Sequence, residues 1–164
     1  MTPLSADPLQ AARAFLSLRR IALAGASRDA GHFSRALLRE LVRRGYDVVP
    51  VNPGATEIEG LGCHARIGDV TPPPEGVLVL TPVARTDAVV ADALAAGVRH
   101  VWLHRGGGAG SATADARAAC EARGVRPVTD LCPLMALPGA AWPHRLHGWI
   151  RARGLRRCEC PAAT

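Results

Sequence analysis

Residues 21–27, with the sequence Ile21-Ala22-Leu23-Ala24-Gly25-Ala26-Ser27, decide the fold of this chain. Four apolar residues in a row, closed by a glycine, predict a short strand that is buried on both faces, as the strands of parallel sheets are. A loop follows the glycine, and an amphipathic helix is predicted over residues 35–44 with Gly45 at its end. A buried strand, a glycine turn and a helix in this order indicate the first unit of an α/β fold.

The same rhythm continues along the chain. Further strands are predicted over residues 47–51, 77–80, 100–103 and 126–128, and further helices over residues 8–18, 83–96, 111–123 and 143–153. We expect Ser34 and Ser111 to cap the helices that follow them. This alternation predicts one Rossmann-like α/β domain, with a parallel sheet of about five strands and helices on both faces. The domain is expected to span residues 1–154, with its core at about 15–135, followed by a tail over residues 155–164.

Charge and composition narrow the class of partner. The chain has 164 residues and a net charge of +6, but the segment from Arg145 to Thr164 holds five arginines and one glutamate. Since the basic residues gather near this end, we do not expect the domain as a whole to bind nucleic acid. No apolar run reaches the roughly 20 residues of a membrane span, and five irregularly spaced cysteines do not indicate a disulfide framework. We expect a cytoplasmic protein without a membrane partner, whose oligomeric state the sequence leaves open.

The loops after the strands carry the candidate site. In a parallel sheet these loops meet at one edge, where α/β proteins bind ligands. They contain Gly25-Ala26-Ser27-Arg28, Asn52-Pro53-Gly54, Thr81-Pro82, His104-Arg105-Gly106 and Asp130-Leu131-Cys132-Pro133. Gly25 allows close backbone approach, and Arg28 offers a planar cation suited to phosphate. With the hydroxyl of Ser27 and the helix-start amides near Ser34 and Arg35, they predict a pyrophosphate site; the alternative is a turn without a ligand.

The end of the second strand bears on which nucleotide fits. NAD sites place an acidic residue there to bind the ribose hydroxyls, whereas this chain has Asn52 and Pro53. The full G-x-G-x-x-G pattern is also missing after the first strand. These departures disfavour an NAD-dependent dehydrogenase, although Arg28 would suit the 2′-phosphate of NADP. An NADP-dependent oxidoreductase domain therefore stays an alternative.

Other motifs have less specific interpretations. The glycine-rich stretch 106–110 is either a second anion cradle or a linker. His104 and Cys132 are a candidate nucleophile pair, but a buried structural cysteine is the commoner case, so we expect no catalytic residues. His144, His147, Cys158 and Cys160 form a candidate zinc set at unusual spacing, and we expect no metal. A third function, from another class, is binding of an acidic protein through the arginine-rich tail.

Three stretches resemble the small CoA-binding domain family, which is similar in fold to the N-terminal domain of the succinyl-CoA synthetase alpha subunit. They are residues 21–27, the run Gly45-Tyr46-Asp47-Val48-Val49-Pro50-Val51-Asn52-Pro53, and Val101-Trp102-Leu103. The resemblance covers residues 15–135 and implies a five-stranded Rossmann-like domain that binds CoA across the strand ends. Our first hypothesis is therefore a non-catalytic carrier or sensor of CoA or an acyl-CoA. The loop Arg28-Asp29-Ala30-Gly31-His32, His104 and the glycine-rich extension depart from the family pattern.

The resemblance also implies a place for each site residue. Gly25, Ala26, Ser27 and Arg28 would meet the phosphates, with Ser34 at the helix start. Asn52 and Pro53 would lie beside the adenosine. Thr81 and Pro82 would line the floor of the site, and the loop of His104 and Arg105 would lie near the pantetheine arm.

Overall fold

The computed structural model describes residues 8–104 and 111–138. The elements in chain order are α1 (Pro8–Leu16), β1 (Arg20–Ala24), α2 (Phe33–Arg43), β2 (Asp47–Val51), β3 (Glu57–Ile58), β4 (Leu61–Gly62), η1 (Ile67–Asp69), β5 (Gly76–Val79), α3 (Val83–Ala95), β6 (His100–Leu103), α4 (Ala114–Ala122) and α5 (Pro133–Ala136). No helix within these two ranges is both long and apolar enough to cross a membrane. The predicted helix over residues 143–153 and the tail lie outside the described residues.

Four parallel strands form the central sheet, in the order β2-β1-β5-β6. The chain runs outward from β1 to β2 and then returns to the other side of β1 to form β5. The strand order therefore reverses between β1 and β5. In open α/β sheets the ligand crevice lies at the carboxyl ends of the strands beside such a reversal.

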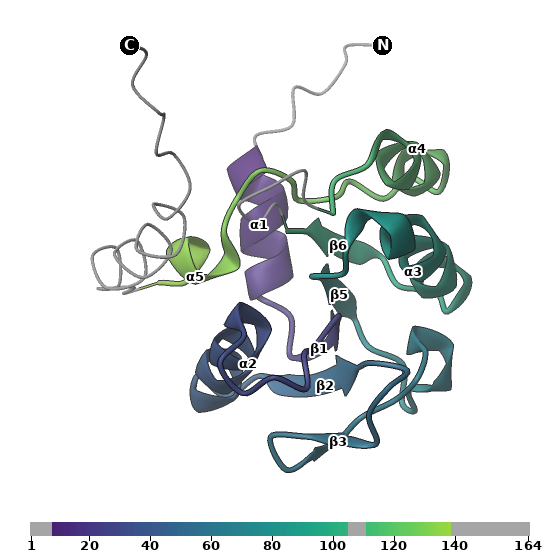
Figure 1. The fold of residues 1–164 in the computed structure, drawn as a ribbon. Helices are drawn as coiled ribbons and strands as arrows, with labels where there is room; N and C mark the ends of the chain where they lie inside the picture. The colour runs from purple at the N-terminus through teal and green to yellow at the C-terminus, as the bar shows by residue number, and fades with distance from the viewer. Residues whose placement is uncertain (1–7, 105–110, 139–164) are drawn as a thin grey trace, which may run out of the picture.

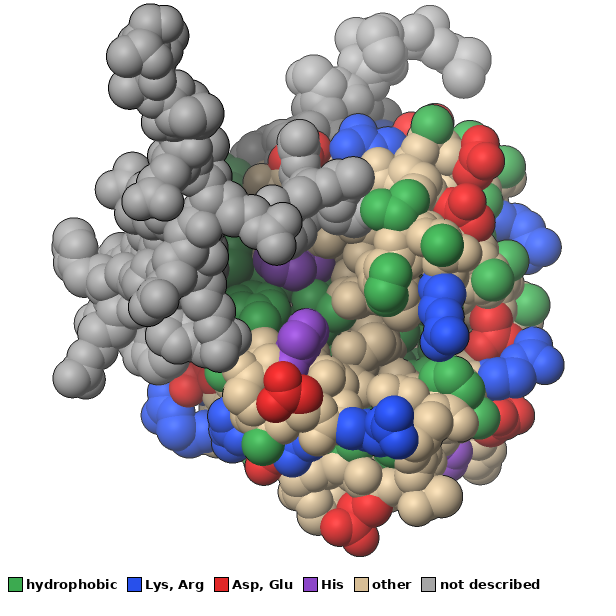
Figure 2. Space-filling model, viewed as in Figure 1, with side chains coloured by type: hydrophobic (Ala, Val, Ile, Leu, Met, Phe, Trp, Pro, Cys, Tyr) green, Lys and Arg blue, Asp and Glu red, His purple; other side chains and the backbone are tan. Residues whose placement is uncertain are grey.

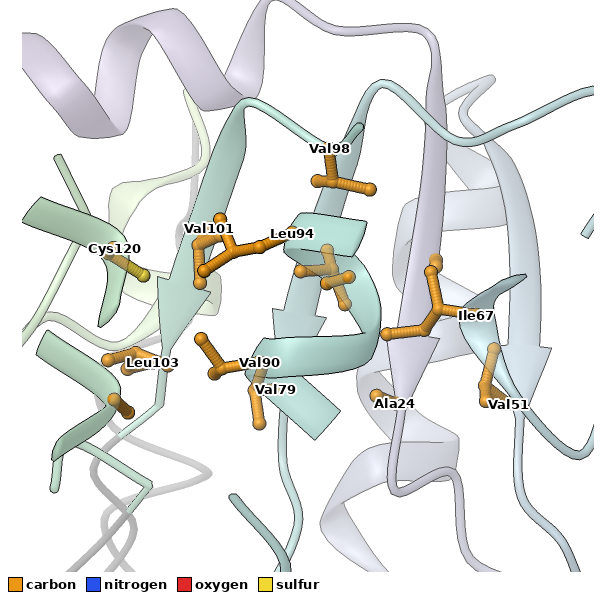
Figure 3. Close-up of a cluster of buried hydrophobic side chains, with 14 of the residues drawn as sticks. Ala24, Val51, Ile67, Val79, Val90, Leu94, Val98, Val101, Leu103 and Cys120 are labelled. Carbon is orange, nitrogen blue, oxygen red and sulfur yellow. The ribbon is translucent and has the colours of Figure 1, made fainter. Parts of the chain in front are cut away.

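Both faces of the sheet are buried, as the apolar strands predicted. Ile21 and Leu23 of β1 pack among residues of α1 and α2, whereas Ala22 and Ala24 pack among residues of α3 and α4. Figure 1 shows these two helix pairs on opposite sides of the sheet. Figure 3 shows the core on the α3 and α4 side of the sheet, where Val90 of α3 lies close to Val79 of β5. The predicted Rossmann-like α/β architecture is confirmed.

The predicted fifth strand is wrong. Residues 126–128 pair with β6 only through one bridge, in which Val128 lies beside Trp102. The Val128 amide donates to the Val101 carbonyl at 2.8 Å, and the Leu103 amide donates to the Val128 carbonyl at 2.8 Å. Pro127 has no amide hydrogen to extend the ladder, and Asp130 turns the chain away with a φ of 59°.

Trp102 of the edge strand β6 contacts both α1 and the segment that follows Val128. Its ring is fully buried and meets Phe15 of α1 edge-on, at a centroid distance of 5.3 Å. Its indole nitrogen donates to the Leu131 carbonyl at 3.0 Å. Because a buried indole N–H needs an acceptor, this bond holds the segment after Val128 against β6.

The bend at Gly25 can be tested against a matched glycine. Gly25 has a φ of +90°, and a Cβ built there would lie 2.8 Å from the Leu80 carbonyl carbon and 2.8 Å from the Thr81 nitrogen. Gly97 has a similar φ of +84° but open space around it. We expect Gly97→Ala to lower the free energy of unfolding by about 1–2 kcal/mol through backbone strain alone. Gly25→Ala should lose a further 1–3 kcal/mol, roughly, because the methyl group overpacks the site.

Chemical denaturation of both variants measures this difference. Equal losses for Gly25→Ala and Gly97→Ala would contradict the close approach of the Gly25 bend to the end of β5.

Candidate functional site

The bend after β1 is wedged between the ends of its two neighbouring strands. The Gly25 amide donates to the Val51 carbonyl of β2 at 3.0 Å, and on the other side the Leu80 amide donates to the Ala24 carbonyl at 2.8 Å. The positive φ expected of Gly25 is present. The close approach that it allows in this structure is to the backbone of residues 80–81.

The loop from Gly25 to His32 is closed by its own side chains. The Ser27 amide donates to Ser34 Oγ at 2.9 Å, and the Asp29 amide donates to Ser27 Oγ at 3.1 Å. The Gly31 amide donates to Asp29 Oδ1 at 2.9 Å. These short-range bonds define the shape of the loop before any ligand arrives.

Ser34 is not the helix cap that was predicted. Helix α2 begins at Phe33, and His32 is its N-cap, with Nδ1 accepting the Ser34 amide at 3.2 Å. Ser34 is fully buried because its hydroxyl closes the loop onto Ser27 instead. The Arg35 amide donates to the His32 carbonyl at 3.0 Å, so the two amides expected to face an anion are already bonded within the chain.

Three amides of this segment are not hydrogen-bonded by other described residues, and one of them belongs to the fully buried Ala26. Those of Ala26, Arg28 and Phe33 have no hydrogen-bond partner among the described residues. Two of them, Ala26 and Arg28, belong to the predicted phosphate loop. Because Ala26 is fully buried, an anion over this loop would meet the amides of Arg28 and Phe33, which are not the two amides that the sequence suggested.

Asn52 joins the first and second loops. Its Nδ2 donates to the Ala26 carbonyl at 2.7 Å, and its Oδ1 accepts the Gly54 amide at 2.7 Å. Both ends of the side chain are therefore engaged within the protein. Asn52 acts as a positioning residue, while Pro53 and Gly54 lie exposed beside it.

An open groove of about 640 Å³ lies between these two loops. It is lined by Arg28, Arg35, Pro53, Gly54, Ala55, Thr56, Glu57, Cys63 and Ala65. The guanidinium of Arg28 rests against Gly54: a Cβ built on the glycine would lie 3.9 Å from Arg28 Nε and 4.0 Å from Arg28 Cζ. The Arg28 side chain has no hydrogen bond or ion pair with any described residue.

Arg35, in contrast, is fully engaged. Its Nε donates to Glu59 Oε1 at 2.7 Å, and its Nη1 donates to the carbonyls of Ser27 and Arg28 at 3.2 Å each. Arg39 Nη1 also donates to Glu59 Oε1, at 2.6 Å. The hydrogen bond from Arg35 is the main cause that lowers the pKa of the Glu59 carboxyl. This cluster fastens the β3–β4 hairpin to the first loop.

The sequence analysis missed this role of Glu59. Glu59 lies 24 residues from Arg35 along the chain, in the turn of a two-stranded hairpin. No spacing rule links the two positions. The only local signal is the sequence Glu59-Gly60 between two apolar residues, which is compatible with a tight hairpin turn.

Thr81 and Pro82 lie on the other side of Gly25, at the end of β5. The Thr81 carbonyl accepts the Ser111 hydroxyl at 3.0 Å, and Pro82 precedes α3 as its exposed N-cap residue. The prediction that Ser111 caps α4 is therefore wrong. Thr113 is the cap, since its hydroxyl accepts the Ala116 amide at 3.0 Å.

His104 follows β6 and faces the start of α2. Its ring stacks on Phe33 with a centroid distance of 5.1 Å and an interplanar angle of 14°. Its Nδ1 is buried without a hydrogen-bond partner, and burial lowers the pKa of the imidazole. Figure 2 shows a hollow near the centre of this face, where histidine and hydrophobic side chains lie. Arg105, also predicted for the site, lies outside the described residues.

Two further hypotheses concerned a His104–Cys132 nucleophile pair and a zinc site. No hydrogen bond joins His104 to Cys132 in the described part of the chain, where Cys132 is the N-cap residue of α5. Within residues 8–104 and 111–138 no group of three or more metal-binding side chains comes together. His144, His147, Cys158 and Cys160 lie outside these ranges, so the structure does not test the zinc hypothesis.

The burial of His104 predicts a pH dependence of stability. Because its folded-state pKa is lowered, the unfolded chain binds a proton at this residue first as the pH falls through about 6.5. The unfolded state then holds more protons, so the free energy of unfolding falls with the pH. His104→Phe keeps a ring against Phe33 and removes this titration, so its advantage over the wild type should grow from about pH 8 to about pH 5. Urea denaturation across this range measures it, and parallel pH curves would contradict it.

Comparison with known proteins extends this description. The model of the CoA binding domain family matches residues 19–138. The chain is similar to a conserved hypothetical protein from Pyrococcus furiosus, with 29% identity and a TM-score of 0.64 over 70% of this chain and 95% of the other. A Thermus thermophilus protein has 28% identity and a TM-score of 0.69, over 78% of this chain and 95% of its own.

A larger enzyme contains a similar domain. The dinucleotide-forming acetyl-coenzyme A synthetase 1 of Ca. Korarchaeum cryptofilum has 26% identity and a TM-score of 0.57, over 65% of this chain. The match takes up 25% of the synthetase chain, so it concerns one part of that enzyme. From the family match and the parallel sheet together, the chain belongs to the CoA binding domain family.

Proposed function

We propose that this protein binds CoA or an acyl-CoA at the carboxyl edge of its sheet and acts as a carrier or sensor. The observation that carries the proposal is the free guanidinium of Arg28, which lies at the groove between the first two loops. A cation without an internal partner, beside a loop with unbonded amides, is suited to a phosphate group. Membership of the CoA binding domain family names the ligand class.

The arrangement of the ligand follows the strand order. In this proposal Gly25, Ala26, Ser27 and Arg28 form the phosphate loop, and the hydroxyl of Ser27 and the guanidinium of Arg28 contact the phosphates. The adenosine lies toward Asn52 and Pro53, at the end of β2. Ser34 supports the phosphate loop from beneath, through its bond to the Ser27 amide.

The other half of the ligand extends across β5 and β6. Thr81 and Pro82 line this path, and His104 and Arg105 lie near the pantetheine arm. The neutral ring of His104, stacked on Phe33, presents an apolar surface that suits an uncharged chain.

We propose a role without catalysis because of the properties of the cysteine thiols and of His104. Burial raises the pKa of the Cys63 thiol and raises that of Cys120 to about 11, so neither is a ready nucleophile at neutral pH. His104 has no hydrogen-bonded cysteine or carboxylate partner among the described residues. A Cys–His nucleophile pair relies on such a contact.

The NADP alternative is less well supported. Arg28 suits a ribose phosphate in either cofactor, so it does not separate them. The family match, however, favours CoA. A docking function of the arginine-rich tail concerns residues outside the described ranges.

Ligand-dependent stabilisation tests the proposal. Thermal denaturation with CoA, acetyl-CoA, NAD, NADP and ATP should show stabilisation by CoA or acetyl-CoA, of about 2.7 kcal/mol at 100 times the Kd. Stabilisation by NADP alone would favour the oxidoreductase alternative and contradict the proposal.

The role of Arg28 is tested by substitution. Arg28→Ala should weaken CoA binding by about 10- to 100-fold, the value of a charge-assisted hydrogen bond, and should leave the melting temperature of the free protein unchanged. Arg99→Ala is the matched control, since Arg99 is an exposed arginine just before β6, at the opposite edge of the sheet. Isothermal titration should give wild-type affinity for this control. Equal affinity of Arg28→Ala and the wild type would remove Arg28 from the site.

A further inference from the structure

We infer that Arg28 binds the phosphate on the ribose of the ligand, the 3′-phosphate of CoA, rather than the diphosphate. It thereby sets the preference of the site for a phosphorylated ribose. The inference rests on the proposed function and assigns one residue of the site to one group of the ligand.

The guanidinium of Arg28 lies toward the second loop. In an open α/β sheet the diphosphate of a nucleotide binds at the bend after the first strand and the start of the following helix, whereas the ribose lies at the end of the next strand. Arg28 is part of the first loop by sequence. Its guanidinium, however, rests against Gly54, two residues after Asn52 and three after the end of β2. The charge therefore lies at the ribose end of the site.

Hydrogen bonds of Asn52 and Arg35 hold Arg28 in this position. Asn52 holds both the Ala26 carbonyl and the Gly54 amide, so the two loops are fixed relative to each other. Arg35 Nη1 donates to the carbonyl of Arg28 and so holds its backbone. Gly54 has no side chain to separate the guanidinium from the second loop.

Arg28 is the groove cation whose guanidinium has no hydrogen-bond or ion-pair partner among the described residues. Arg35 also lines the groove, but its guanidinium is engaged by Glu59 and by two backbone carbonyls. Glu57, the acidic residue of the lining, makes no ion pair with Arg28. A ligand phosphate is then the natural partner of Arg28.

The ribose phosphate and the diphosphate of CoA differ in the partners that suit them. A phosphate monoester on a ribose carries a charge of about −1.5 to −2 at neutral pH and three terminal oxygens, which match the planar fork of arginine. The diphosphate has the alternative of the unbonded backbone amides of Arg28, in the first loop, and Phe33, at the start of α2. The two groups therefore have separate partners in this site.

Isothermal titration with CoA and dephospho-CoA, which lacks only the ribose phosphate, tests the inference. The wild type should bind CoA about 10- to 100-fold more tightly than dephospho-CoA. Arg28→Ala should bind the two ligands equally, because its affinity for CoA falls to that of dephospho-CoA. Arg28→Lys keeps the charge without the fork and should give an intermediate ratio. Arg99→Ala should keep the wild-type ratio.

The possible results separate the inference from the proposed function. Equal binding of CoA and dephospho-CoA by the wild type would overturn the inference and leave CoA binding intact. So would an equal loss of affinity for both ligands in Arg28→Ala, which would assign Arg28 to the diphosphate. If the wild type binds neither ligand, the proposed function fails and the inference fails with it. Circular dichroism and melting of each variant show that a lost preference does not come from unfolding.

Discussion

The backbone at Gly25 approaches the end of β5 so closely that one methyl group would not fit between them. This contact, together with the bond from the Gly25 amide to the Val51 carbonyl, draws the first loop between its neighbouring strands. The loop therefore leaves the sheet at the reversal of strand order. Every candidate site residue in the described ranges is placed relative to that bend: Asn52 and Pro53 on the β2 side, Thr81, Pro82 and His104 on the side of β5 and β6.

The polar groups around the bend divide into two sets. One set holds the loops together: Ser34 with Ser27, Asn52 with Ala26 and Gly54, and Arg35 with Glu59. The other set, the Arg28 guanidinium and a few amides, has no partner among the described residues. Since buried polar groups are normally hydrogen-bonded, the first set explains the stability of the edge. The second set is the one to which we assign the phosphates in the proposed function.

Sequence reasoning was most successful for the core. The apolar runs of β1, β2, β5 and β6 have a residue of suitable size on each face, and the period of two brings alternate side chains to opposite helix layers. It was less successful at element ends. Ser34 and Ser111 illustrate why: several residues near each helix start are able to cap it, and these two hydroxyls are already used by another loop residue, Ser27 and Thr81 respectively. The short stretch ending at Val128 shows the same limit, because Pro127 and the turn at Asp130 outweigh its apolar character.

By itself, the sequence determined the class of the fold and the loops that meet at one edge, because strand periodicity and glycine positions are local properties of the chain. It also placed Gly25, Arg28 and Asn52 at that edge. Only the tertiary structure decided which of their polar groups stay free. Glu59 pairs with Arg35 from 24 residues away, and the side chain of Arg28 packs against Gly54 of another loop. A hydrogen-bond partner is set by distance in space, and the order of residues along the chain does not contain that distance.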